Sequence, residues 1–198
     1  MRNTSLKDAG KDAGLSHDKP QNREDTELVW LDEPYRHTIG RGYFDDELYL
    51  EMLARLPDDK DYVAYPSYPG RNIYPIKSGF WADIAGLVKR GKHARVQLVR
   101  DYPGYFITPH TDSQKDTCTI LFYLTDKERE TGGTSVFVPK DKEFKSNGHG
   151  NFPFKDFNLI KTAPYVPNGY YGHYRSDVSF HGVYPVEFTR NILQVNFY

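Results

Sequence analysis

Cysteine is nearly missing from this chain of 198 residues, which has only Cys118. No disulfide can form within the chain, and we expect a reducing, cytoplasmic setting. A surplus of charge is also missing, since 26 Lys and Arg stand against 27 Asp and Glu. A balanced chain offers no basic field for nucleic acid and no polybasic anchor for a membrane.

Long hydrophobic runs are absent as well. No stretch approaches the ~20 apolar residues that a membrane-spanning helix needs, and the N-terminus lacks the apolar segment of a signal peptide. Residues 1–27 contain Lys-Asp-Ala-Gly twice and few apolar side chains. We therefore expect a flexible polar tail over 1–27, followed by one domain over 28–198.

Aromatic residues, glycine and proline are plentiful, with 16 Tyr, 12 Phe, 16 Gly and 13 Pro. This composition favours short strands joined by turns over a helical bundle. Eight strands are expected after residue 93: Ala94–Tyr102, Tyr105–Asp112, Thr117–Thr125, Thr134–Pro139, Leu159–Tyr165, Tyr170–Tyr174, Val178–Val183 and Asn191–Tyr198. The prediction is a mainly β (α+β) fold, a double-stranded β-helix with a jelly-roll or cupin-like core over about 93–198.

The part before this core, about 28–92, predicts helical support packed on one sheet. A short first strand is expected at 28–31, with Trp30 as an anchor. Asp45 is expected to cap one helix, and Ser78 a second helix that ends before Gly91. The Tyr- and Pro-rich segment 62–75 between them is interpreted as an irregular packed connector rather than a substrate-facing loop. The polar segment 141–156 is either a surface loop or an active-site lid.

Two of the expected strands have one apolar face and one mixed face. In 117–125 the mixed face carries Thr119 and Tyr123, and in 191–198 it carries Gln194 in step with Arg190. In an ordinary sheet the mixed face would meet water. In a barrel that holds a site it would line the cavity, and periodicity alone leaves both arrangements open.

The run His110-Thr111-Asp112 places an imidazole and a carboxylate on the same face of an extended segment. These are two of the three ligands of a non-haem iron facial triad. So short a pair arises readily by chance, so a third ligand must be found elsewhere. The best candidate is His181, which lies in a strand context beside Gly182, with Arg190 nine residues further on.

In this order and spacing the chain resembles the Fe(II)- and 2-oxoglutarate-dependent dioxygenases, specifically the prolyl 4-hydroxylase-like branch. The resemblance covers about 94–198. Four further pieces match the same branch: Tyr102-Pro103-Gly104, the strand Thr119–Thr125, the turn Gly132-Gly133, and the hairpin from Asn168-Gly169 to Tyr174.

The resemblance implies a set of roles. His110, Asp112 and His181 would bind Fe(II), and Arg190 would bind the distal carboxylate of 2-oxoglutarate with help from Tyr123. Weaker cofactor candidates are Tyr102, Thr119 and Gln194. O2 would be the oxidant, with ascorbate as a possible additional cofactor. The implied reaction hydroxylates a C–H bond of an amino acid, a peptidyl residue or another small molecule, with release of succinate and CO2.

Several residues distinguish this interpretation from its alternatives. Asp112 stands where related halogenases carry a small residue, and Asn196 where nucleic-acid demethylases carry a second arginine. A hydrolytic zinc site would give Arg190 no role. A non-catalytic jelly-roll module that binds a metal or a sugar remains the alternative from another class.

Three other polar residues were assigned lesser roles. Arg100 and Arg71 are weak candidates for substrate contacts, and for Arg100 a surface ion pair is equally expected. His173 is expected on a strand surface rather than at the metal.

Overall fold

The computed structural model describes residues 28–148 and 150–198. Residues 1–27, the expected tail, lie outside the described residues. The helices and strands are β1 (His37–Arg41), α1 (Asp46–Ala54), β2 (Val63–Ala64), β3 (Arg71–Tyr74), α2 (Phe80–Lys89), β4 (Ala94–Asp101), β5 (Ile107–His110), β6 (Cys118–Tyr123), β7 (Arg129–Pro139), β8 (Phe157–Tyr165), β9 (Gly169–Tyr174), β10 (His181–Val183) and β11 (Arg190–Phe197), with short 3₁₀ turns at Asp59–Asp61 and Phe154–Asp156.

The strands form two antiparallel sheets. The large sheet has seven strands in the order β1-β9-β6-β11-β4-β3-β2, and the small sheet has four in the order β5-β10-β7-β8. Strands that follow one another in the sequence often belong to different sheets, so the chain crosses repeatedly between the two layers. A mainly β fold is therefore confirmed, and all eight strands expected after residue 93 are present, with shifted ends.

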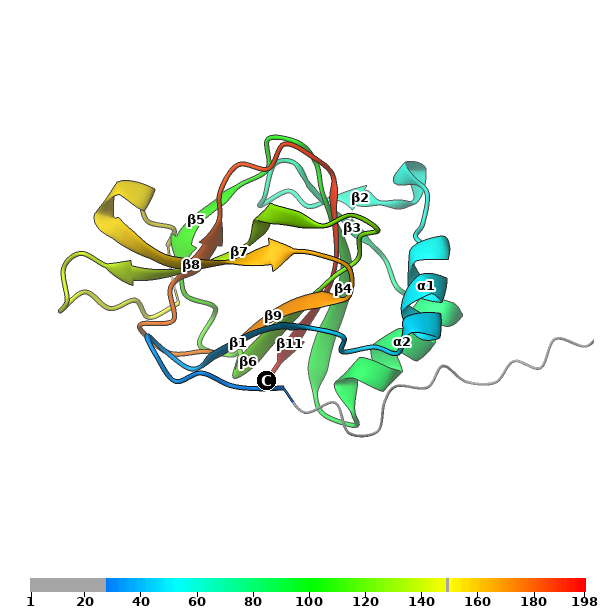
Figure 1. The fold of residues 1–198 in the computed structure, drawn as a ribbon, viewed down its shortest axis with the longest axis horizontal. Helices are drawn as coiled ribbons and strands as arrows, with labels where there is room; N and C mark the ends of the chain where they lie inside the picture. The colour runs from blue at the N-terminus through cyan, green and yellow to red at the C-terminus, as the bar shows by residue number, and fades with distance from the viewer. Residues whose placement is uncertain (1–27, 149) are drawn as a thin grey trace, which may run out of the picture.

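Helices α1 and α2 cover the outer face of the large sheet, as expected, and lie side by side in Figure 1. Helix α1 begins where the Asp45 carboxylate accepts a hydrogen bond from the Leu48 N–H. Beneath the helices lies the apolar face of β6 and β11, and Met52, Ile84 and Leu193 at this interface are fully buried. Burying this layer holds the helices on the sheet.

The opposite face of the large sheet looks toward the small sheet. A second apolar cluster lies between the layers and includes Val99, Val136 and Ile192. The mixed faces of β6 and β11 point into this interior and not into water, so the barrel arrangement is the correct one of the two considered.

Three local expectations were wrong. Helix α2 begins at Phe80, and the residue at its N-cap is Gly79, which has no capping side chain, and not Ser78. Segment 62–75 is not irregular, since β2 and β3 form a hairpin that extends the edge of the large sheet. Segment 28–31 contributes only a single bridge, between Leu31 and His37, and the first strand is β1.

In the part of the chain that the structure describes, neither helix has the length and apolarity required to cross a bilayer.

Candidate metal centre and anion pocket

His110 and His181 are direct neighbours across two strands. His110 ends β5, His181 begins β10, and the strand register places them opposite each other. Their ring centroids are 4.4 Å apart. Gly182 makes this approach possible, because a Cβ at that position would lie 2.7 Å from the Ile107 carbonyl oxygen.

Backbone carbonyls fix the orientation of both imidazoles. His110 Nδ1 lies 2.9 Å from the Thr108 oxygen, and His181 Nδ1 lies 3.0 Å from the Ser179 oxygen. A carbonyl only accepts, so each Nδ1 carries the proton and donates it. Each Nε2 lone pair is therefore left to bind a metal, an arrangement typical of metal-ligating histidines.

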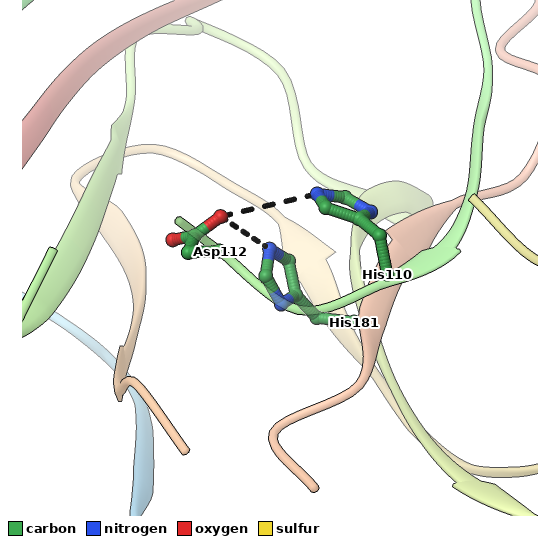
Figure 2. A group of neighbouring side chains, drawn as sticks. All are labelled: His110, Asp112 and His181. Carbon is green, nitrogen blue, oxygen red and sulfur yellow. Dashed lines mark ion pairs between the residues drawn. The ribbon is translucent and has the colours of Figure 1, made fainter. Parts of the chain in front are cut away.

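Asp112 completes the group two residues after His110. Its Oδ1 lies 3.5 Å from His181 Nε2 and 3.9 Å from His110 Nε2. The three candidate ligand atoms all lie within 4.8 Å of one another. Figure 2 shows the three side chains turned toward one another, with one carboxylate oxygen facing both rings. Two imidazole nitrogens and one carboxylate oxygen in this arrangement fit the facial-triad donor set.

The electrostatics keep His110 and Asp112 in ligating form, whereas His181 must lose its proton when a metal binds. Burial and the nearby His181 lower the pKa of His110 to about 3, so its ring is neutral at pH 7. Burial raises the pKa of Asp112, but His181 and His173 outweigh it and hold the pKa well below its usual range. For His181, burial lowers the pKa, and Asp112 reverses the shift to a net rise. A neutral imidazole and a carboxylate are the forms that bind metal.

The triad opens into a cavity of about 320 Å³ between the two sheets. One side of its wall comes from the large sheet, through residues that include Thr119, Arg190 and Gln194. The hairpin β2–β3 contributes Tyr65, Tyr68 and Arg71, so the expectation that segment 62–75 is only a packed connector was wrong. From segment 141–156, Gly148, Gly150 and Asn151 reach the cavity.

Arg190 is the most unusual residue in the wall. Its side chain is fully buried, and none of its three guanidinium nitrogens has a hydrogen-bond partner among the described residues. The carboxylate of Asp101 lies closest, with Oδ2 3.4 Å from Arg190 Nη1. Arg71 already binds this carboxylate through two hydrogen bonds. One fully buried and one largely buried guanidinium group thus share one buried carboxylate, and the surplus positive charge favours an anion in the cavity.

Three hydroxyl groups lie near Arg190, and that of Thr134 belongs to a residue that lines the cavity, whereas Tyr123 and Tyr105 interact with Arg190 from behind the wall. Tyr123 is buried, and its oxygen accepts a 2.9 Å hydrogen bond from the Thr134 N–H, so its own proton is left to donate. The hydroxyls of Tyr105 and Thr134 are buried without hydrogen-bond partners among the described residues. These unpaired polar atoms fit a carboxylate such as the distal group of 2-oxoglutarate.

Two sequence candidates lie elsewhere. Arg100 and Tyr102 share the strand face of Leu98, which packs under the helices, so their side chains point away from the cavity. Arg100 forms an ion pair with Asp59, and the Tyr102 hydroxyl donates to the same carboxylate. Tyr102 is not among the residues that line the cavity, and of the two roles considered for Arg100 the ion pair is the one that forms. Arg71 does line the cavity.

The sequence interpretation also misplaced His173. It is fully buried, not on a surface, and its Nε2 lies 3.2 Å from Asp112 Oδ2. The reason is that β9 is an interior strand of the large sheet, where the His173 face looks into the barrel opposite Thr119. The alternation of side chains along a strand is the sequence signal that could have located His173. It assigns His173 to the interior only once the residue paired with it, Thr119, is known to point inward.

Comparison of the sequence with protein-family models gave no match, and comparison with curated proteins gave none either. Comparison of the fold with solved structures did give matches. A prolyl-4-hydroxylase of Pseudomonas putida is 16% identical with a TM-score of 0.52, over 81% of this chain and 91% of that chain. A prolyl hydroxylase of Trichoplax adhaerens, in complex with a peptide fragment of hypoxia inducible factor, is 13% identical with a TM-score of 0.56, over 82% and 83%.

A third similar structure is HygX of Streptomyces hygroscopicus with nickel, 2-oxoglutarate and hygromycin B bound. It is 14% identical, with a TM-score of 0.51 over 81% of this chain and 82% of that chain. The chain therefore has the jelly-roll fold of the 2-oxoglutarate-dependent oxygenases, and the expected double-stranded β-helix is confirmed. At these identities the likeness establishes the fold, whereas activity depends on the residues of the site.

Proposed function

We propose that this protein is an Fe(II)- and 2-oxoglutarate-dependent dioxygenase of the prolyl 4-hydroxylase-like branch, which hydroxylates an unactivated C–H bond. The observation that carries the proposal is that His110, Asp112 and His181 open into the same cavity as the buried Arg190, whose guanidinium nitrogens have no hydrogen-bond partner among the described residues. A metal triad alone fits many reactions, but a triad with a buried anion pocket fits a metal that is chelated by a dicarboxylate cosubstrate.

Bound Fe(II) and 2-oxoglutarate would supply the oxidation by O2, with release of succinate and CO2. The protein residues bind and orient. His110 and His181 present Nε2 to the metal, and Arg190 with Tyr123 receives the distal carboxylate. A planar guanidinium suits a carboxylate better than an ammonium would, because it donates two parallel hydrogen bonds.

The outer part of the cavity supports a small polar substrate, such as an amino acid, over a peptidyl residue. Arg95 and Asp116 line it, and neither takes part in an ion pair among the described residues. Tyr65 and Tyr68 stack beside them with ring centroids 5.5 Å apart. Unpaired charges of both signs beside an aromatic wall can hold a molecule that carries a carboxylate and an ammonium group. The buried, free Cys118 fits a reducing compartment such as the cytoplasm.

The test is anaerobic loading of the purified protein with Fe(II) and 2-oxoglutarate. We expect the visible charge-transfer absorption of the chelate, and we expect His181→Ala to lose it. Amino acids and peptides are then screened for substrate-stimulated succinate formation in air. Metal binding without the charge-transfer band and without succinate formation would overturn the assignment as an enzyme and favour a non-catalytic binding module.

A further inference from the structure

Five side chains form one row across five neighbouring strands of the large sheet. The strand register places Arg95 opposite Asn196, Asn196 opposite Thr119, Thr119 opposite His173, and His173 opposite His37. We call these residues the polar row. Three of them line the metal-site cavity, and the row passes beside Asp112. Directly opposed residues on adjacent strands are close enough to interact, so the row forms a continuous polar track.

The hydrogen bonds along the row have a fixed direction. Gln194 Nε2 and Arg95 Nη2 lie 2.9 Å and 3.5 Å from Asn196 Oδ1, and both groups only donate. This sets the Asn196 amide so that its Nδ2 donates to Thr119 Oγ1 over 2.9 Å. The single hydroxyl proton of Thr119 is then directed to Asp112 Oδ2, 2.5 Å away.

His173 approaches the same oxygen from the next strand. Its Nε2 lies 3.2 Å from Asp112 Oδ2. The side chain is fully buried, and neither ring nitrogen forms a well-aligned hydrogen bond within the described part of the chain, so the approach of Nε2 to Oδ2 is a close electrostatic contact. The two carboxylate oxygens of Asp112 therefore have different surroundings. Oδ2 faces Thr119 and His173, while Oδ1 faces the two candidate metal ligands.

We infer that Thr119 and His173 are positioning residues that restrict Asp112 to a single metal-facing oxygen, Oδ1. The inference rests on the proposed function and adds to it. A carboxylate that binds a metal through both oxygens occupies two coordination positions. The two contacts to Oδ2 prevent such bidentate binding. Three coordination positions of the metal then stay open for a chelating cosubstrate and O2.

The test uses Co(II) alone as the probe, because its visible absorption reports the coordination number. Thr119→Val keeps the shape of the side chain and removes the hydroxyl. We expect it to weaken Co(II) binding by about 10- to 100-fold and to change the absorption spectrum. Thr119→Ser restores the hydroxyl and is expected to restore both the affinity and the spectrum. Thr117→Val is the matched control, since Thr117 is an exposed threonine whose hydroxyl donates to the Phe197 carbonyl and lies away from Asp112.

A second variant keeps the inference falsifiable if Thr119→Val folds poorly. His173→Phe retains an aromatic ring against Tyr171 and Tyr35 and removes the nitrogen at Oδ2. We expect the same direction of change in affinity and spectrum, with metal-free thermal unfolding used to compare the folds. The inference is overturned if both variants bind Co(II) with the wild-type affinity and spectrum. Wild-type Co(II) binding without any 2-oxoglutarate turnover would instead overturn the proposed function and leave this inference intact.

Discussion

Asp101 and Arg190 form a buried contact in which the cation is only partly neutralised. Both side chains are fully buried, and Arg190 Nη1 lies 3.4 Å from Asp101 Oδ2. The same carboxylate is held more closely by Arg71, whose Nε lies 2.6 Å from Oδ1. The shared carboxylate leaves Arg190 with unused donors.

Arg190→Ala is expected to weaken binding of 2-oxoglutarate by about 10- to 150-fold, because charge-assisted hydrogen bonds contribute about 1.5–3 kcal/mol. Co(II) affinity is expected to stay within about twofold of wild type, since Arg190 does not contact the triad. Titration calorimetry with each ligand measures both. Arg41→Ala, which removes a surface ion pair with Glu128, is the control. Equal loss of metal and 2-oxoglutarate affinity would contradict the assigned role.

Asp101→Asn is expected to lower the free energy of unfolding by about 3–5 kcal/mol, because it leaves the buried Arg190 and the largely buried Arg71 without their shared anion. Urea denaturation followed by fluorescence gives the value. Asp58→Asn serves as the control, since Asp58 is exposed and its ion pair with Lys60 is worth little. The account of the cluster is wrong if the two variants are equally stable.

Two glycine-to-alanine substitutions are expected to change the free energy of unfolding in opposite directions. A Cβ at Gly133 would lie 1.7 Å from the Ala163 carbonyl oxygen on the paired strand, so Gly133→Ala must displace the β7–β8 backbone. We expect a loss of about 3 kcal/mol from this overpacking. Gly86 lies exposed inside α2 with open space around it, and Gly86→Ala is expected to gain about 0.5–1 kcal/mol. Thermal unfolding of the two variants distinguishes these outcomes.

Cys118 is expected to resist alkylation in the folded protein. Burial raises the pKa of its thiol to about 12, so about one molecule in 10⁴ carries a thiolate at pH 8. Iodoacetamide labelling followed by mass spectrometry is expected to show slow reaction of native protein and fast reaction in urea. The rate of labelling should rise with pH up to about 12, because only the thiolate reacts. Rapid native labelling at pH 8 would show that the thiol is accessible.

Much of the fold was readable from the sequence because side-chain alternation in β6 and β11 is regular. Leu193 on one face and Arg190 on the other correctly separate the helix side from the cavity side. Adjacent residues in β4 show the limit of this reasoning. Arg100 was chosen for its charge, but it shares the face of Leu98, and the inward residue is Asp101.

The triad was readable because its members lie in recognisable order, whereas the surrounding residues come from register between strands distant in sequence. Thr119 and His173 are 54 positions apart in the chain, yet they are opposed in the sheet. No local pattern reports such a pairing. The hairpin of β2 and β3 was missed for a related reason, since its two short strands gain stability only by pairing with β4.

The distribution of the site over the two sheets has a thermodynamic consequence. His110 and His181 belong to the small sheet, while Arg190 belongs to the large one. A metal chelate that spans these groups would act as a noncovalent cross-link between the two layers. By mass action it would favour the closed barrel over any opening that separates the sheets. Backbone amides of β5 and β10 would then exchange with solvent more slowly in the loaded protein, which links the occupancy of the site to the persistence of the fold.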